Sequence, residues 1–295
     1  MASSPTPVAG TNRSPAGLQP APYTSRFVDA GGLRLHYLDY GTPGLPPMLC
    51  VHGGAAHAHW FDFVAAGFKS AYHVRALDQR GHGESAWAGS PAYTYQHYAA
   101  DLAEVVEKLD LHDFVLIGHS MGGMVSLVYA ATYPGRVGKL IVVDTTMRMG
   151  EERISAMRQR GSQEGSKYTS REELIARYRL LPPGTQAAPE VLHHLAQQAG
   201  RQFGDGTWRH KFDRNVYAMR ESLDGLPLWG RIAIPALLVK GGLSQRITPE
   251  IAAEVQARCP HVRLAEVPHS DHHVTLDNPP AFVNAVMAFL APPAR

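Results

Sequence analysis

The sequence predicts an α/β fold: a mostly parallel sheet with helices covering both faces and a helical cap inserted late in the sheet. Short apolar runs alternate with stretches of helical spacing over much of the chain. Strands that are apolar throughout are typical of a parallel sheet buried on both faces. The alternation stops between Met147 and Leu228 and then resumes, which indicates an insertion.

The N-terminal residues 1–22 are rich in Ser, Pro, Ala, Gly and Thr, and they contain no apolar stretch of the length a signal peptide needs. This composition predicts a disordered tail. The α/β core is then expected to comprise residues 23–146 and 229–295, with residues 147–228 as the cap. The segment Ser25–Tyr40 alternates apolar and polar residues around Gly31-Gly32 and predicts a hairpin.

The expected core strands are short apolar runs that end in polar or glycine-rich residues. They lie at Pro47–Val51, His73–Leu77, Phe114–Ile117, Lys139–Val143, Ala236–Val239 and Val262–Val267. Helical spacing marks the core segments Tyr95–Leu109, Met121–Tyr133, Pro249–Cys259 and Pro280–Leu290 and the cap segments Arg171–Leu181, Pro189–Ala199 and Trp208–Leu223. Because open α/β sheets bind ligands at the carboxyl edge of their strands, the cap is expected to shape a pocket there.

Charge, cysteine content and hydropathy indicate which kinds of partner and which cellular compartment to expect. The net charge is +2 and no run of lysine or arginine occurs, so nucleic acid is not an expected partner. Only Cys50 and Cys259 are present, which favours a reducing compartment over a disulfide framework. No apolar run approaches the roughly 20 residues that span a bilayer. We therefore expect a cytoplasmic protein without a membrane partner, and self-association into a homo-oligomer is compatible with the sequence.

The segment Val115–Gly123, V-L-I-G-H-S-M-G-G, predicts a serine held on a sharp turn between a strand and a helix. In such an elbow the residues two before and two after the serine must be small, a demand that Gly118 and Gly122 meet. The strained turn would present Ser120 at the carboxyl edge of the sheet and leave the N–H of Met121 free to bind an oxyanion.

A nucleophilic serine needs a base, and the base needs an orienting group. His272 follows the last expected strand, where a loop at the carboxyl edge would bring it towards Ser120. On position alone, the neighbouring His269 and His273 remain competitors.

With these motifs, the chain resembles the α/β-hydrolase superfamily, and specifically its capped, esterase-like branch, from about Phe27 to Leu290. The resemblance rests on an oxyanion loop, a D-x-R-G-x-G-x-S loop and a nucleophile elbow. These match His52–Gly54, Asp78–Ser85 and Gly118–Gly122. The family's catalytic histidine stands seven residues before a proline that opens the last helix, and counting back from Pro279 selects His272.

The carboxylate departs from the family's commonest pattern. Members usually carry an aspartate after the strand that follows the cap, but here that loop holds Ser244 and Gln245. The resemblance to members with an earlier acid implies Asp144, at the end of Lys139–Val143, with Ser244 as an assisting hydrogen-bond donor. Asp78 is the second candidate, although its motif favours a role in tying its own loop together, with Arg80 as a buried partner.

The resemblance also implies Gly54 as the second oxyanion donor beside Met121. His119, His57 and Trp60 are candidates for substrate binding. Neighbouring histidines near residue 52 lack a carboxylate or cysteine set at a recognised zinc spacing, so no metal is expected. No G-x-G-x-x-G or P-loop motif occurs in the oxyanion loop, and no cofactor is expected.

These features predict a serine hydrolase that cleaves carboxylic esters of small, fairly apolar substrates through a Ser-His-Asp triad and an acyl-enzyme. The expected partner is a small-molecule ester. The alternatives are a carbon–carbon bond hydrolase, a lactonase or a perhydrolase on the same fold, or a non-catalytic protein whose capped pocket binds a small molecule.

Overall fold

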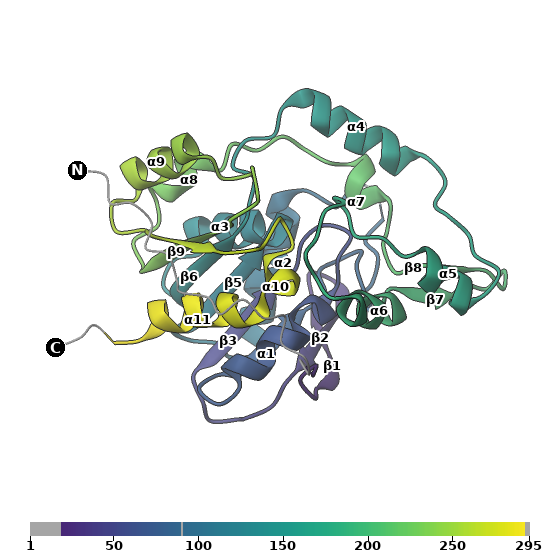
Figure 1. The fold of residues 1–295 in the computed structure, drawn as a ribbon, viewed down its shortest axis with the longest axis horizontal. Coiled ribbons are helices and arrows are strands. Elements are labelled where there is room, and N and C mark those ends of the chain that lie inside the picture. Colours follow the sequence, from purple (N-terminus) through teal and green to yellow (C-terminus); the bar gives the residue numbers. More distant parts are fainter. Residues whose placement is uncertain (1–18, 90, 293–295) are drawn as a thin grey trace.

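An eight-stranded sheet forms the centre of the molecule (Figure 1). The computed structural model describes residues 19–89 and 91–292. The strands are β1 (Thr24–Ala30), β2 (Leu33–Asp39), β3 (Pro47–Val51), β4 (His73–Leu77), β5 (Phe114–His119), β6 (Val137–Val143), β9 (Ala236–Gly241) and β10 (Arg263–Val267). Their spatial order is β1-β2-β4-β3-β5-β6-β9-β10. β1 and β2 pair antiparallel, as does β2 with β4, and the remaining pairs are parallel.

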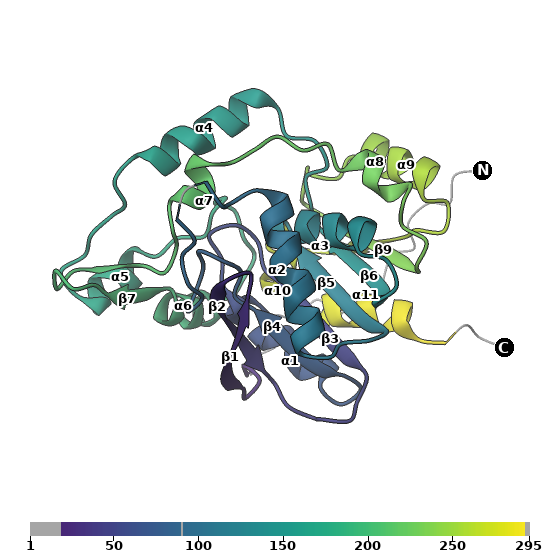
Figure 2. The ribbon, with the colours of Figure 1, turned by 180° about the vertical axis from the view of Figure 1, so that it is seen from behind.

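Helices cover both faces of this sheet, which confirms the predicted fold class. One face carries α2 (Tyr95–Lys108), α3 (Met121–Thr132), α8 (Leu226–Trp229) and α9 (Pro249–Arg258). The other carries the 3₁₀ turn η1 (Ala58–Phe61), α1 (Asp62–Phe68), α10 (Val274–Asp277) and α11 (Pro279–Leu290). Figure 1 shows α1 and α11 in front of the sheet, and Figure 2 shows α2 and α3 from behind. Each face is therefore sealed by its own apolar cluster.

The first residues that pack on the core lie close to residue 22, where the sequence predicts that the tail ends. The predicted tail, residues 1–22, falls mostly outside the described residues, since residues 1–18 are among those left out. Its last part packs against the core, because Ala21 is buried and its N–H donates to the carbonyl of Asp62 at 2.8 Å.

The segment between β6 and β9, which the sequence predicts to be a cap at residues 147–228, extends to one side of the sheet (Figure 1). It contains α4 (Glu151–Ser162), α5 (Arg171–Arg177), α6 (Pro189–Gln198), α7 (Asn215–Ala218) and a two-stranded hairpin of β7 (Gly200–Gln202) and β8 (Trp208–His210). At its C-terminal end α8 packs against α3 and α9, with Trp229 buried.

Two features of the cap differ from the prediction. The helix expected over Trp208–Leu223 is wrong, because Asp205-Gly206 turns the chain back, with Gly206 at φ 79°, and Trp208 starts a strand. Helix α4 was missed because only Ile154 and Gly161 along it are buried, so it has no apolar stripe to reveal it.

No helix among the described residues combines the length and apolar character that crossing a bilayer requires.

Candidate active site

Ser120 occupies the sharp turn between β5 and α3, in a strained backbone conformation. Its φ of 54° and ψ of −116° lie in a region that residues with a side chain rarely adopt. A Cβ on Gly118 would lie 2.4 Å from the carbonyl oxygen of Gly122, and one on Gly122 would lie 2.3 Å from that of Val51. The glycines are thus required sterically, as the sequence predicts for an elbow.

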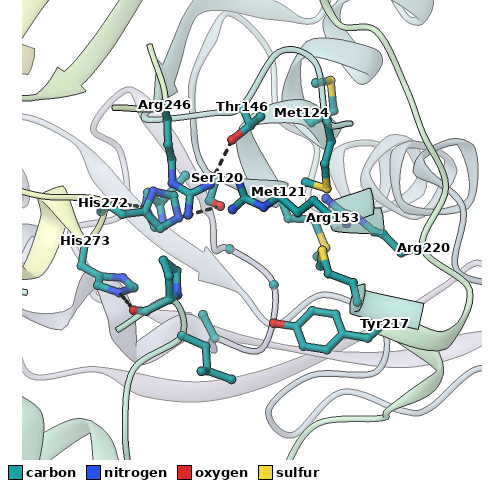
Figure 3. A pocket seen from close by; sticks show the side chains of 18 of the residues that line it. Ser120, Met121, Met124, Thr146, Arg153, Tyr217, Arg220, Arg246, His272 and His273 are labelled. Carbon is teal, nitrogen blue, oxygen red and sulfur yellow. Dashed lines mark hydrogen bonds between the residues drawn. The ribbon is translucent and has the colours of Figure 1, made fainter. Parts of the chain in front are cut away.

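Ser120, His272 and Asp144 form a continuous hydrogen-bonded chain, of which Figure 3 shows Ser120 and His272. Ser120 Oγ lies 2.9 Å from His272 Nε2, and His272 Nδ1 lies 2.7 Å from Asp144 Oδ2. Because Nδ1–H donates to the carboxylate, Nε2 is the bare nitrogen that can accept the serine proton. The three side chains come from the ends of β5 and β6 and from the loop after β10, which meet at the same edge of the sheet.

Asp144 is completely buried and receives hydrogen bonds from two further groups. Ser244 Oγ donates to Oδ2 at 2.8 Å, and the N–H of Gly241 donates to Oδ1 at 3.3 Å. Burial raises the pKa of the Asp144 carboxyl above its ordinary value, and these two hydrogen bonds oppose that rise. Ser244 therefore contacts the residue that the sequence pairs it with.

His272 is held in the neutral form by its surroundings. Burial lowers its pKa well below the ordinary histidine value, and the positive charges of Arg246 and Arg153 lower it further. A neutral imidazole at neutral pH is the form that can act as a general base.

His119 supports the loop that carries His272. Its Nε2 donates to the carbonyl oxygen of His272 at 2.7 Å, and no residue in the described part of the chain bonds its Nδ1. Burial, together with nearby His272 and His273, lowers the pKa of His119. His119 also lines the pocket, so it both positions the imidazole and borders the space where a substrate would lie.

The loop after β3 lies directly opposite the elbow. A Cβ on Gly53 would lie 3.2 Å from that of Ser120, and one on Gly54 would lie 3.6 Å from Met121 Sδ. Within the described residues, no acceptor takes the N–H of Gly54 or of Met121. Two free N–H groups beside the serine are the arrangement that an oxyanion requires.

A cavity of about 320 Å³ opens above Ser120. Its floor comes from the core, including Gly54, Trp60 and His119, and its roof comes from α4, α7 and the segment 181–183. Trp60 therefore lines the pocket as expected. His57 does not border it: its ring is buried and packs against Trp60, with centroids 5.3 Å apart.

Comparisons with known proteins agree with this geometry. The family model described as the alpha/beta hydrolase fold matches residues 46–279. The chain belongs to the α/β-hydrolase family. It is 29% identical to esterase Rv0045c of Mycobacterium tuberculosis over 95% of this chain and 93% of the relative. It is 28% identical to 2-(acetamidomethylene)succinate hydrolase of Mesorhizobium japonicum over 91% of this chain and 95% of the relative.

A solved structure supports the same assignment. The crystal structure of E-2-(acetamidomethylene)succinate hydrolase superimposes with a TM-score of 0.78 and is 25% identical. The match covers 91% of this chain and 99% of that one. The cap is thus included in the similarity, because a match limited to the core would cover less of both chains.

Asp78, the second candidate for the acid, lies elsewhere in this α/β hydrolase. Its carboxylate accepts hydrogen bonds from His36 Nδ1 at 2.7 Å and from the N–H groups of Ala58 and Glu84 at 2.6 and 3.0 Å. Through Glu84 it ties its own loop together, as predicted, and it also joins that loop to β2 and η1. The predicted pairing with Arg80 is wrong, since Arg80 forms a bidentate ion pair with Asp101 on α2 at 2.5 and 2.6 Å.

The hydrolase also contains a shared carboxylate between cap and core. Asp62 Oδ2 accepts from His59 Nδ1 at 2.9 Å and from His194 Nε2 at 2.7 Å, while Tyr40 donates to Oδ1 at 2.6 Å. In the described residues, His59, Asp62 and His194 form the one group with three donor atoms close enough to hold a metal ion. Both histidines already bond the Asp62 carboxylate, and His194 on α6 links the cap to α1.

Sequence reasoning missed the charged part of the pocket. Four arginines line it in addition to its methionines and aromatic residues. They are Arg153, Arg160, Arg220 and Arg246. They lie far apart in the sequence and form no motif, and helix α4, which carries two of them, was not predicted. Only the fold brings them to one cavity.

Proposed function

We propose that this protein is a serine hydrolase that cleaves carboxylic esters through an acyl-enzyme. The observation that carries the proposal is the hydrogen-bonded chain from Ser120 through His272 to Asp144 beneath a capped cavity. A buried serine in an ordinary structural role needs neither a strained backbone nor a neutral histidine aimed at its oxygen.

In this mechanism His272 Nε2 takes the proton of Ser120 as Oγ attacks the ester carbonyl. The imidazolium that forms keeps its Nδ1–H on Asp144, which is already in place at 2.7 Å. Negative charge develops on the carbonyl oxygen, and the N–H groups of Gly54 and Met121 would stabilise it. His272 then gives its proton to the leaving alcohol. A water molecule, activated by the same imidazole, releases the acid and restores Ser120.

The known relatives support hydrolysis as the reaction class. One is named an esterase and another a hydrolase, and both align over nearly the full chain. The side chain at the elbow is a serine, which supports an acyl-enzyme rather than the alkyl-enzyme that an aspartate nucleophile forms.

Covalent labelling of Ser120 tests this proposal. A fluorophosphonate probe should label the wild-type protein at Ser120 and should not label the Ser120→Ala variant. 4-Nitrophenyl esters of increasing chain length should be hydrolysed by the wild type only. If Ser120→Ala keeps its esterase activity, Ser120 is not the nucleophile. If the wild type is neither labelled nor active, the protein is a non-catalytic member of the family.

A further inference from the structure

The cavity above Ser120 is lined by charges of one sign. Its described lining includes Arg153, Arg160, Arg220 and Arg246 but no aspartate or glutamate. The chain as a whole is nearly balanced, with 28 lysines and arginines and 26 aspartates and glutamates. The excess of positive charge is therefore local. A cleft lined by one sign of charge concentrates ligands of the opposite sign.

Three of these arginines have no carboxylate partner, unlike neighbouring arginines. On the surface of the cap, Arg158 pairs with Glu151 at 3.1 Å. In the pocket, Arg246 donates to Thr146 Oγ1 at 3.0 Å and lies 3.8 Å from Asp144. For Arg153, Arg160 and Arg220, the described part of the chain offers no carboxylate within ion-pair distance.

Arg220 is the most informative of the three because it is only 8% exposed. Its guanidinium lies over the ring of Tyr95, 4.8 Å from the centroid, and Nη2 donates to the hydroxyl of Tyr95. Its Nε makes no hydrogen bond. Burying a cation without an anion is unfavourable, so such a group is retained where a ligand completes its pairing. The contact with Tyr95 fixes the guanidinium in advance and reduces the entropy lost on binding.

The other arginines converge on the same space. Arg153 and Arg246 both line the cavity, and burial and then the positive charge of Arg153 lower the pKa of Arg246 to about 10. Arg153 also acts on His272, while Arg153, Arg160 and Arg220 all act on the hydroxyl of Tyr217. Figure 3 shows Arg153, Arg220 and Tyr217 among the side chains around Ser120. An anion in this cavity would relieve the mutual repulsion of these groups.

We propose that Arg220 and Arg153 bind a carboxylate of the substrate, so that the enzyme acts on small esters that carry a free acid group besides the bond to be cleaved. This inference rests on the proposed function and names its substrate class. The planar guanidinium fork matches a carboxylate in two parallel hydrogen bonds. Apolar side chains, including Met121, Met124 and Met157, contact the carbon chain between the two ends. The expected fairly apolar substrate is thereby replaced by an amphipathic one.

Matched substrates test the proposal. Mono-4-nitrophenyl adipate carries a carboxylate, and 4-nitrophenyl 6-oxoheptanoate has a neutral methyl ketone in its place. After subtraction of spontaneous hydrolysis, the wild type should favour the adipate at least tenfold in kcat/KM, and the preference should fall with added salt. Arg220→Gln and Arg153→Gln should each reduce that ratio, mainly through the KM of the adipate.

Arg177→Gln is the matched control because Arg177 is an exposed cap arginine paired with Glu173. It should leave the ratio unchanged. The proposal is overturned if the wild type favours the neutral ester and Arg220→Gln leaves the ratio where it was. It is also overturned if both pocket variants and the control change the ratio equally.

A binding measurement separates this inference from the proposed function. Titration calorimetry of adipate into the Ser120→Ala variant needs no catalysis, and binding should be lost when Arg220→Gln is added. Binding by Ser120→Ala together with inactivity of the wild type on both esters would reject the hydrolase while keeping the anion site. Binding of inorganic phosphate but not of adipate would reject the carboxylate.

Discussion

The two walls of the pocket are built in different ways. On the core wall, Asp144 and His272 are buried at strand ends, and their polar atoms are bonded to one another and to Ser244. On the cap wall, Arg153 and Arg160 project from α4, are exposed and have no carboxylate partner among the described residues. In our proposal, the sheet therefore holds the catalytic residues through hydrogen bonds within the protein, while the insertion supplies arginines that a bound substrate would pair.

The largest expected effect lies on the core wall, at His272. His272→Gln removes the base but keeps a polar side chain of similar reach, so we expect kcat to fall by about 10⁴-fold or more. The release of 4-nitrophenolate measures the rate, and circular dichroism checks the fold. Activity within tenfold of the wild type would show that His272, on the core wall, is not the general base.

The next largest effect separates the role of Asp144, which bonds His272, from that of Ser244, which bonds Asp144. Asp144→Asn keeps the shape but removes the charge that stabilises the imidazolium, and kcat should fall by about 10³- to 10⁴-fold. Ser244→Ala removes one of several donors to Asp144 and should cost about tenfold or less. Steady-state kinetics of both variants with one ester give the comparison. If Ser244→Ala is the more severe, Asp144 is not the acid.

A stability measurement compares the rigidity of the two walls. Gly122→Ala places a Cβ 2.3 Å from the carbonyl oxygen of Val51, a backbone atom of β3, so the main chain itself must shift. We expect a loss of about 3 kcal/mol or more in the free energy of unfolding. Gly150→Ala, at the start of α4, meets nothing within 4 Å at φ −65° and should change it by less than about 0.5 kcal/mol. Chemical denaturation measures both, and equal losses would contradict the contrast.

The smallest expected effect is that of Arg153, on the cap wall, on the pKa of His272, on the core wall. The positive charge of Arg153 helps to keep the pKa of His272 low, so Arg153→Gln should let that pKa rise. Because the neutral imidazole is the active form in the proposed mechanism, activity on the neutral ester should then be lost at a higher pH on the acid side. The pH profile of kcat/KM measures the shift, with Arg177→Gln as control. A shift to lower pH would have the wrong sign for this explanation.

Much of the core could be predicted from the sequence because its signals are local. The strand at Phe114 runs two residues further than expected, and the apolar runs at Pro47–Val51 and His73–Leu77 match β3 and β4. The elbow needs glycine at positions 118 and 122 for a steric reason that depends only on their spacing from the serine. The cap was less predictable, because α4 is mostly exposed and the Asp205-Gly206 turn competes with the helical spacing that follows it.

Contacts between side chains on distant segments were predictable only where the resemblance to the family marked both partners, as for Ser120, His272 and Asp144. Asp78 ties together its own loop, as expected. Arg80 instead reaches Asp101 on α2, a partner that no spacing in the sequence reveals. The arginines of the pocket show the same limit, since Arg153 and Arg220 come to one cavity from segments far apart in the sequence.

The carboxylate of Asp62 determines which part of the cap is held firmly. It is completely buried and is bonded at once by Tyr40 and His59 of the core and by His194 of α6. Moving α6 away from the core would remove the hydrogen bond from His194 to the buried Asp62 carboxylate, which costs about 1–3 kcal/mol. Helix α4 has no comparable anchor, since only Ile154 and Gly161 along it are buried. The α6 side of the cap is thus tied to the core through a buried charge, whereas Arg153 and Arg160 lie on α4, which packs on α7 within the cap.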